Sequence, residues 1–194
     1  MRKLQIGVMG SAGDTKYSKA AEQAAYGLGR GIAQRGAILF FGAEKDYDSL
    51  STAACRGAKS AGGLTVGVTY GKGKNIVQSD ADVILPSGLV RGGGRELALV
   101  LPCDSVITIS GGSGTLTEMA IAYQANIPLI ALKGYGGCTD YYAGRFIDSR
   151  RTLRIIEAGT PKEAVKLAIR EGLSYRRNFE ANIRKDEKYR LRYG

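Results

Sequence analysis

The segment formed by residues 110–118, SGGSGTLTE, combines residue types and spacing that suit the binding of an anion. It follows an apolar run, residues 105–109, that predicts a buried strand, and it precedes residues 116–125, which predict a helix. A glycine-rich turn between a strand and a helix leaves backbone N–H groups free, and the helix dipole adds positive potential there. Glycines also let the backbone approach a ligand closely. We therefore predict a phosphate-binding site formed by Gly111, Gly112, Ser113, Gly114 and Thr115.

Glu118 places a carboxylate one helical turn beyond this predicted anion site. A carboxylate in that position can take part in chemistry on whatever the phosphate is attached to. The spacing Thr115-x-x-Glu118 also fits a capping box, in which Glu118 would accept from a backbone N–H of its own helix. On spacing alone, the catalytic and the capping interpretations both stay open.

Arg95 is the second candidate for a role in chemistry. It follows a run of three glycines that ends at Gly94, and it stands at the start of a predicted helix. A guanidinium there can bind a phosphate or a sugar hydroxyl through its forked donors. The alternative is a surface arginine that is paired with Glu96 or another acid. The neighbouring glycines favour the ligand-binding role, so Arg95 and Glu118 are our candidate catalytic residues.

Apolar runs alternate with amphipathic segments along most of the chain. Predicted strands are residues 4–9, 37–41, 64–69, 83–85, 105–109 and 127–132, with a last strand at 151–157. Predicted helices are residues 17–35, 50–61, 95–101, 116–125 and 161–171. Strands that are apolar on both faces and separated by helices indicate a parallel sheet covered on both sides. We therefore predict an α/β fold, a Rossmann-like doubly wound parallel sheet in a three-layer α/β/α sandwich.

In such folds, ligands bind beyond the carboxyl ends of the strands. The loops predicted at that edge are residues 10–14, 42–46, 91–95 and 110–118. They are rich in small residues, which suits a nucleotide-sized cleft, and they add Gly10, Ser11, Gly13 and Gly94 to the predicted ligand-binding residues. No GxGxxG motif follows the first predicted strand and no GxxxxGK[ST] loop is present, so we do not expect a conventional NAD enzyme.

The chain contains no histidine, which excludes Ser-His-Asp catalysis, Cys-His catalysis and histidine-ligated zinc. Any acid–base group must then be Glu, Asp, Lys, Tyr or Cys. The cysteines Cys55, Cys103 and Cys138 are widely spaced and form no CxxC pair. We therefore predict buried or half-buried free thiols and no metal site.

The 194 residues suit one domain, which we place at residues 1–172, followed by a basic and helical tail at residues 173–194. The net charge of the chain is +10. Because acids are interleaved with the basic residues of the tail, we predict a solvated or packed helix, with nucleic acid an unlikely partner. No apolar run approaches the ~20 residues that cross a bilayer, and no signal peptide is visible. We expect a soluble, cytoplasmic protein that does not bind membranes.

The pattern Gly111-Gly112-Ser113-Gly114-Thr115-x-x-Glu118, with Arg95 upstream, resembles the PGGxGTxxE motif and arginine of the LOG (Lonely Guy) family. That family was long mislabelled as lysine decarboxylases. Its members are Rossmann-like phosphoribohydrolases that cleave a nucleoside 5′-monophosphate to a free base and ribose 5-phosphate. The sequence is most similar to the sub-branch with the molybdenum-cofactor carrier proteins, over roughly residues 4–170. The resemblance implies phosphate binding at residues 111–115 and a catalytic pair, Arg95 and Glu118, and nothing in it supports lysine decarboxylation.

Three positions depart from the family's pattern. Ser110 replaces a proline, and Glu96 stands where a lysine is expected. Residues 42–50 read GAEKDYDSL in place of GGGxxGLM, or of GGxxGVM in the sub-branch. The three acids between residues 44 and 48 would repel a phosphate. Either the pocket is reshaped for a different ligand or this loop turns away.

The resemblance leads to a nucleotide-binding protein with possible phosphoribohydrolase activity. The alternative is a non-catalytic carrier or sensor of a nucleotide or of a pterin phosphate such as the molybdenum cofactor. A third hypothesis is an interaction protein whose basic tail binds nucleic acid. The expected ligand is accordingly a nucleotide, a phosphate or the molybdenum cofactor. We also expect a homodimer or higher homo-oligomer, because LOG relatives assemble through helices near the site and residues 119–125 predict an exposed apolar helix.

Overall fold

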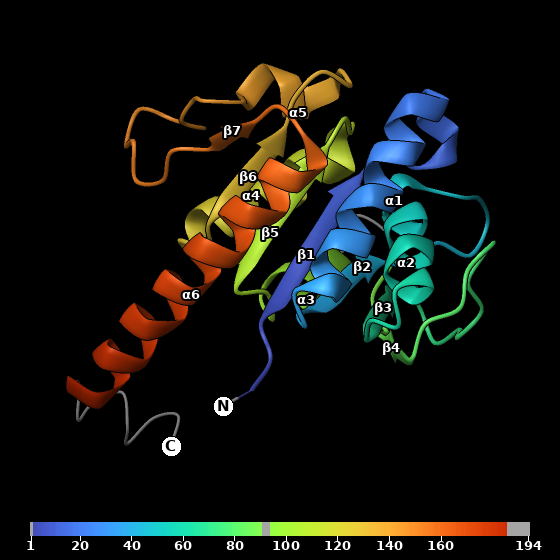
Figure 1. Ribbon diagram of the computed structural model, residues 1–194, viewed down its shortest axis with the longest axis horizontal. Helices are drawn as coiled ribbons and strands as arrows, with labels where there is room; N and C mark the ends of the chain where they lie inside the picture. The colour runs from blue at the N-terminus through green and yellow to red at the C-terminus, as the bar shows by residue number, and fades with distance from the viewer. Residues whose placement is uncertain (1, 91–93, 186–194) are drawn as a thin grey trace.

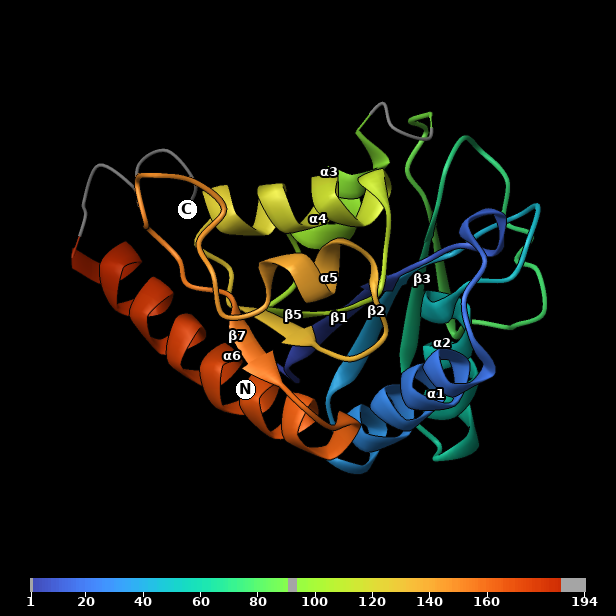
Figure 2. The ribbon, with the colours of Figure 1, turned by 90° about the horizontal axis from the view of Figure 1, so that it is seen from above.

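The computed structural model describes residues 2–90 and 94–185, with side chains as far as residue 181. A parallel sheet lies between two layers of helices (Figures 1 and 2). Its strand order, β4-β3-β2-β1-β5-β6-β7, runs outward in both directions from the centre, so the predicted doubly wound α/β sandwich is confirmed. The strands are β1 (Gln5–Gly10), β2 (Ile38–Gly42), β3 (Thr65–Thr69), β4 (Val83–Pro86), β5 (Ser105–Ile109), β6 (Leu129–Leu132) and β7 (Ile156–Ala158).

Helices α1, α2 and α6 cover one face of the sheet, and α3, α4 and α5 cover the other (Figure 2). The helices are η1 (Gly13–Thr15, a 3₁₀ turn), α1 (Lys19–Gln34), α2 (Leu50–Ser60), α3 (Arg95–Val100), α4 (Ser113–Gln124), α5 (Gly137–Tyr142) and α6 (Pro161–Lys185). None of those in the described ranges is long and apolar enough to cross a membrane.

The sheet divides the apolar core in two, because adjacent residues of a strand point to opposite faces. Phe41 packs with residues of α1 and α2, whereas its neighbour Phe40 packs with residues of α3 and α4. Both faces of the central strands are therefore buried, which explains their continuous apolar runs. Gly10 pairs with Ile109, so β1 and β5 end side by side and their loops open on the same edge.

Helices α1 and α2 approach each other at two glycines. A Cβ atom at Gly29 would lie 1.7 Å from the carbonyl oxygen of Ala54, and one at Gly57 would lie 1.9 Å from that of Tyr26. Real side chains do not tolerate such distances from backbone atoms. The two helices can therefore pack backbone to backbone only because both positions are glycine.

The last helix is longer than the sequence predicted. We expected it to end before Gly172, but α6 continues to Lys185. Gly172 does not end the helix because it packs against the sheet. A Cβ atom there would lie 3.3 Å from Ser105 Oγ and 3.4 Å from Leu4 Cδ2. The predicted boundary at 172 thus falls inside one helix, and a separate tail at residues 173–194 stays a prediction.

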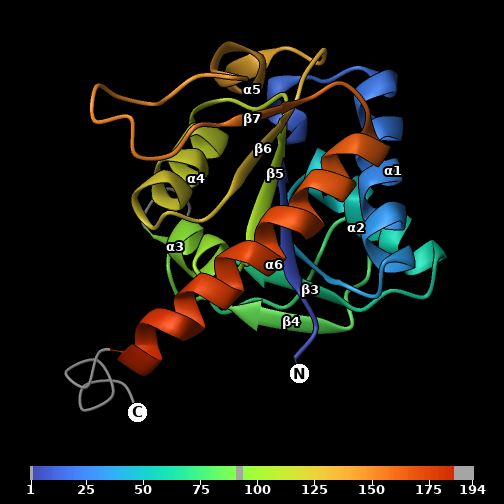
Figure 3. The same ribbon diagram turned by 60° about the vertical axis from the view of Figure 1, so that its left-hand side comes forward.

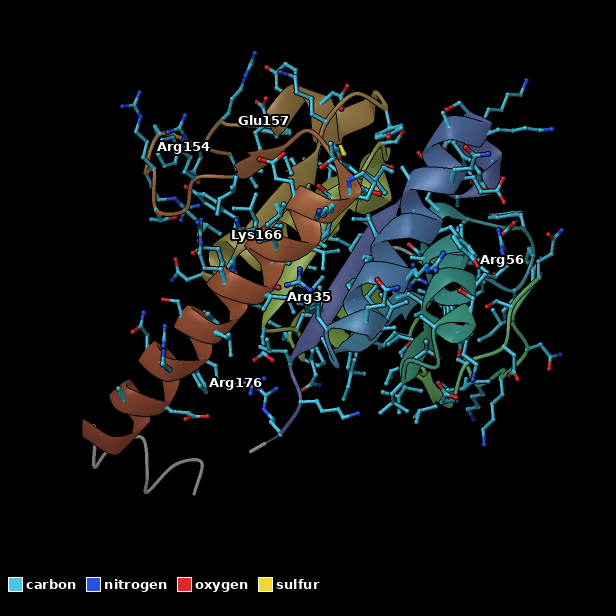
Figure 4. The ribbon with its side chains drawn as sticks, viewed as in Figure 1. Arg35, Arg56, Arg154, Glu157, Lys166 and Arg176 are labelled. Carbon is cyan, nitrogen blue, oxygen red and sulfur yellow. The ribbon has the colours of Figure 1, made fainter. Side chains whose placement is uncertain are left out.

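Beyond Gly172, α6 runs past the edge of the sheet and is tied to the start of the chain (Figure 3). The buried carboxylate of Asp104 accepts from Arg176 Nη2 at 2.8 Å and from Arg2 Nη2 at 2.7 Å. Arg176 also donates to the carbonyl oxygen of Arg2 at 2.8 Å (Figure 4). Burial alone would raise the pKa of Asp104, but the hydrogen bonds from the two guanidinium groups outweigh it and hold that pKa below its usual value.

Some elements differ from the sequence predictions. The patterns indicate neither η1 nor α5, which lie in glycine-bearing segments. The strand predicted at residues 151–157 begins only at Ile156. The residues before it pair with a loop instead, because the N–H of Ile155 donates to Arg145 and its carbonyl accepts from Gly144.

The expectation of an exposed apolar helix at residues 119–125 is wrong. Met119, Ala122 and Tyr123 are buried in the core, and apolar side chains between residues 142 and 153 pack against them. Tyr123 also donates from its hydroxyl to Asp148 Oδ1 at 2.7 Å. A group of exposed large apolar side chains lies instead on β4, on α3 and between them: Val83, Leu85, Leu89, Val90, Leu97 and Leu101. Homo-oligomer formation stays a prediction.

Candidate functional site

A cavity of about 360 Å³ opens at the carboxyl ends of β1, β2 and β5, where the strand order reverses. Ligands of doubly wound sheets bind in this position. Most of the predicted site residues line the cavity: Gly10, Ser11, Arg95, Gly112, Ser113, Gly114, Thr115 and Glu118. The other predicted residues, Gly13, Gly94 and Gly111, do not line it.

Each of these three glycines stands next to a residue that lines the cavity. The N–H of Gly13 donates to the carbonyl oxygen of Asp48 at 2.7 Å, which joins the first loop to the second. Gly94, with φ at 115°, precedes the first turn of α3. The remainder of the third predicted loop, residues 91–93, lies outside the described residues.

Further residues line the cavity that were not predicted as ligand-binding, although the loops 10–14 and 42–46 and the departure at Glu96 point to some of them: Ala12, Asp14, Thr15, Gly42, Glu44, Ser49, Ser51, Glu96 and Thr117. Ser49 and Ser51 lie at the start of α2, a second helix whose amino end faces the cavity. Ser49 is its N-cap, accepting from the N–H of Thr52 at 3.0 Å. A serine just before a helix is a recognised cap signal that could have placed this helix start at the site.

The turn between β5 and α4 reverses direction at two residues with positive φ, Ser110 at 56° and Gly111 at 95°. Ser11 holds it from the neighbouring loop. Its Oγ accepts from the N–H of Gly111 at 2.9 Å and donates to Ser110 Oγ at 3.1 Å. Gly111 has no room for a side chain, since a Cβ atom would lie 2.4 Å from that of Thr115. Only glycine therefore fits at this point of the turn, and a ligand contact of Gly111 stays a prediction.

Helix α4 begins at Ser113, and its N-cap, Gly112, has no side chain with which to cap the helix. In the described part of the chain, the N–H groups of Ser113, Gly114 and Thr115 donate to no protein acceptor. All three residues line the cavity. These donors and the positive end of the helix dipole therefore offer a place for an anion.

Helix α5 supports this turn from outside the cavity. The N–H groups of Cys138 and Thr139 donate to the carbonyl oxygens of Gly111 and Ser110 at 2.9 and 3.1 Å. Burial raises the pKa of the Cys138 thiol to about 11, so it stays protonated at neutral pH. Gly137, the first residue of α5, permits this close approach, since a Cβ atom there would lie 2.4 Å from the carbonyl oxygen of Gly111.

Glu118 is not a capping residue. Because α4 begins at Ser113, Thr115 is already inside its first turn and cannot be the N-cap. The Glu118 side chain is buried and lines the cavity. Its pKa is raised to about 8: burial is the main cause, Arg95 opposes the rise, and the charges of Glu96 and Glu44 add to it. Glu118 therefore carries a proton at neutral pH, as a general acid would.

Arg95 is buried against the end of β2. The alternative of an arginine on the surface is therefore wrong, although the pairing with acids that it included is present. Its Nη1 lies 3.2 Å from Glu44 Oε1, and its Nε lies 3.8 Å from Glu96 Oε1. A Cβ atom at Gly42 would lie 3.2 Å from Arg95 Nη1, which shows how closely the guanidinium covers this glycine. Arg95 thus reaches the site already paired with acids.

The three carboxylates of the acidic loop, residues 44–48, have different surroundings. Glu44 faces the cavity and is 5% exposed. Asp46 turns away and accepts from the hydroxyl of Tyr70. Asp48 pairs with Arg56 at 2.9 Å and does not line the cavity. The pocket is therefore reshaped by one acid, and the rest of the loop is turned away.

Within residues 2–90 and 94–185, no group of three or more Cys, Asp or Glu side chains is placed to hold a metal ion. Cys55 and Cys103 are buried free thiols, and Cys138 is half-buried, as predicted. The chemical groups of the site are therefore backbone N–H donors, hydroxyls, four carboxyl groups and one guanidinium.

Several solved structures are similar to this one over most of the chain. TM1055 superposes with a TM-score of 0.77 and 29% identity, over 86% of this chain and 99% of that one. The molybdenum cofactor binding protein from Rippkaea orientalis superposes with a TM-score of 0.74 and 30% identity, over 88% of this chain and 98% of that one. The molybdenum cofactor carrier protein from Chlamydomonas reinhardtii superposes with a TM-score of 0.74 and 28% identity, over 89% of this chain and 99% of that one.

The sequence comparisons agree with the structural ones. A protein from Archaeoglobus fulgidus is 33% identical over 133 residues, which are 69% of this chain and 82% of that protein. The family model described as SLOG cluster4 matches residues 3–165, a range that includes every residue lining the cavity. The fold, the glycine turn with Arg95 and Glu118, and this match lead to one conclusion: the chain belongs to the SLOG cluster4 family of the LOG-like Rossmann superfamily.

Proposed function

We propose that the chain binds a small phosphorylated ligand, a nucleotide or a pterin phosphate, with the phosphate at the start of α4. The uncapped N–H groups of Ser113, Gly114 and Thr115, which open into a cavity, carry this proposal. The position at the switch point of the sheet supports it. So do the printed names of two similar structures, a molybdenum cofactor binding protein and a molybdenum cofactor carrier protein.

Replacing Ser113 tests the phosphate site directly. Ser113→Pro removes one N–H at the first helical position, where proline is well tolerated. A hydrogen bond to a charged group contributes about 1.5–3 kcal/mol, so we expect roughly 10- to 150-fold weaker binding. Calorimetry with inorganic phosphate, AMP, GMP and a pterin monophosphate measures the affinity. Ser113→Ala, which keeps the N–H, is the matched control, and equal affinities for the two variants would refute the proposal.

The molybdenum cofactor fits this site at its phosphate end, because the donors offered there are backbone N–H groups. As a carrier, the protein would hold the cofactor as cargo and would need no chemical step. The serines and glycines that line the cavity would bind and orient such a ligand, and the walls of the cavity would keep water from it.

Hydrolysis is a second candidate function, favoured by the protonated Glu118. In a phosphoribohydrolase the bond from C1′ of the ribose to the base nitrogen breaks, and a bond from C1′ to a water oxygen forms. Protonated Glu118 would donate its proton to the departing base, and the resulting carboxylate would take a proton from the attacking water. Arg95 would orient the ribose phosphate. Because Glu44 already pairs with Arg95, we expect AMP to be cleaved slowly.

Release of free base from a panel of nucleoside 5′-monophosphates tests this second function. General acid–base catalysis contributes about 10²–10⁴-fold, so Glu118→Gln should lower any observed rate by at least about 10²-fold. A rate that survives Glu118→Gln would remove this residue from the mechanism. Ligand binding by the wild type without any release of base would favour the carrier function.

A further inference from the structure

The carboxylate of Glu44 lies in the cavity with most of its capacity for accepting hydrogen bonds unused. A carboxylate has about four acceptor positions. In the described part of the chain, Glu44 Oε1 accepts from Arg95 Nη1 at 3.2 Å, and Glu44 Oε2 is buried and accepts from no group. Buried acceptors are normally satisfied, so an unpaired buried oxygen on a residue that lines the cavity indicates a missing donor.

The main chain around Glu44 is held by β3 and by the segment that follows it. The N–H of Ala43, just after β2, donates to Val68 at 3.0 Å, and the carbonyl of Glu44 accepts from the N–H of Val77 at 3.0 Å. These bonds hold the main chain on both sides of the residue. The main chain at Glu44 is therefore held at the edge of the cavity that the side chain lines.

Two groups of residues that line the site offer opposite chemistry. The start of α4 presents N–H donors, whereas Glu44, Glu96 and Glu118 gather around the single guanidinium of Arg95. A ligand that fits both groups has a phosphate for the first and hydrogen-bond donors for the second. This description rests on the proposed function and narrows it.

We infer that Glu44 is a specificity-determining residue, whose carboxylate accepts hydrogen bonds from adjacent N–H groups on the ring of the phosphorylated ligand. The ring class that presents such donors is a 2-amino-4-oxo pyrimidine, as in guanine and in pterins. Its ring N–H and exocyclic NH₂ are neighbours, and they match the two oxygens of one carboxylate. Adenine presents an acceptor nitrogen beside its amino group, and that nitrogen would face the carboxylate unpaired.

A ligand series on the wild-type protein tests this inference. GMP has both donors, IMP lacks the 2-amino group, and AMP lacks the ring N–H. We expect affinity to fall in that order, with GMP roughly 5- to 150-fold tighter than AMP, which is the usual range for one such paired contact. A 6-substituted pterin monophosphate, measured in parallel, distinguishes a pterin from a guanine nucleotide as the preferred source of the ring.

The variant Glu44→Gln assigns the preference to this residue. The amide keeps an acceptor for Arg95 but replaces one acceptor oxygen by a donor, so the preference for GMP over AMP should disappear. Glu157→Gln, on the exposed surface of β7, removes the same charge and should leave the ligand order unchanged (Figure 4).

Two results would overturn the inference. One is equal affinity of the wild type for AMP and GMP. The other is equal tightening of all ligands by Glu44→Gln, which would mean that Glu44 only competes with phosphate for Arg95. The ligand series needs no variant, so it remains decisive if Glu44→Gln does not fold. Absence of binding by every ligand, inorganic phosphate included, would refute the proposed function itself.

Discussion

The stability of the protein should fall as the pH rises from 5 to 9, and Glu118→Gln should remove most of that fall. The folded pKa of Glu118, about 8, is raised above its value of about 4.5 in an unfolded chain. The folded protein therefore binds a proton that the unfolded chain releases in this range. The stability that protonated Glu118 contributes is complete below about pH 4.5 and is lost as the pH rises through 8. A shift of this size corresponds to at most about 5 kcal/mol in the free energy of unfolding.

Glutamine has the shape of a protonated glutamic acid. The variant should therefore match the wild type at pH 5 and should be more stable by several kcal/mol at pH 9. Urea denaturation at pH 5, 7 and 9 measures this difference. Asp148, with its pKa lowered to about 2, titrates below this range, and Tyr17 and Tyr70, with theirs raised to about 12, titrate above it. Burial also raises the pKa values of Cys55, Cys103 and Cys138, so the unfolded chain begins to lose these protons near pH 9, which adds a smaller fall that Glu118→Gln keeps. Wild type and Glu118→Gln with the same slope against pH would contradict the buried, protonated state of Glu118.

Gly29→Ala should destabilise the protein by about 3 kcal/mol or more. The added methyl group would lie 1.7 Å from the carbonyl oxygen of Ala54, and a backbone atom cannot move aside as the end of a side chain can. Helices α1 and α2 would have to separate, which opens the core that they share. The gain in helix propensity on replacing glycine by alanine, about 1 kcal/mol, is too small to offset this cost.

Gly27→Ala, on the same helix, is the matched control. Its Cβ atom would meet only Pro161, at 3.6 Å, which is an ordinary contact. We expect this variant to be unchanged or more stable by up to about 1 kcal/mol. The free energies of unfolding of both variants, measured in urea, give the comparison. A Gly29→Ala variant as stable as Gly27→Ala would show that the two helices are not packed backbone to backbone.

The sequence could predict the elements whose local signals agree with their surroundings. Strand β5 is a continuous apolar run, and the structure has it at the predicted residues, Ser105–Ile109. The glycine turn after it was readable because a strand, small residues and a helix follow one another within a short segment. Gly10 and Ser11 could be placed at the same edge because parallel strands end together.

The features that escaped prediction depend on contacts between distant residues. Gly172 looks like a helix terminator, but it lies inside α6, where it packs closely against Leu4 and Ser105. The loop between residues 44 and 48 gives no local sign that Glu44 alone enters the cavity, since Asp46 is drawn away by Tyr70 and Asp48 by Arg56. The capping box at Thr115 had the right spacing, but the helix begins two residues earlier.

The ion pairs of Asp104 also bear on the order in which the chain is completed during synthesis. Strand β1 lies at the centre of the sheet, yet Arg2, in the segment before it, accepts through its carbonyl oxygen from Arg176, 174 positions further along. The ribosome must release the segment with Arg176 before that contact can form. A nascent chain that has finished β5 therefore holds Asp104 with only one of its two arginines. Helix α6 thus completes its contacts with Arg2 and Asp104 only after the strands that it covers have been synthesised.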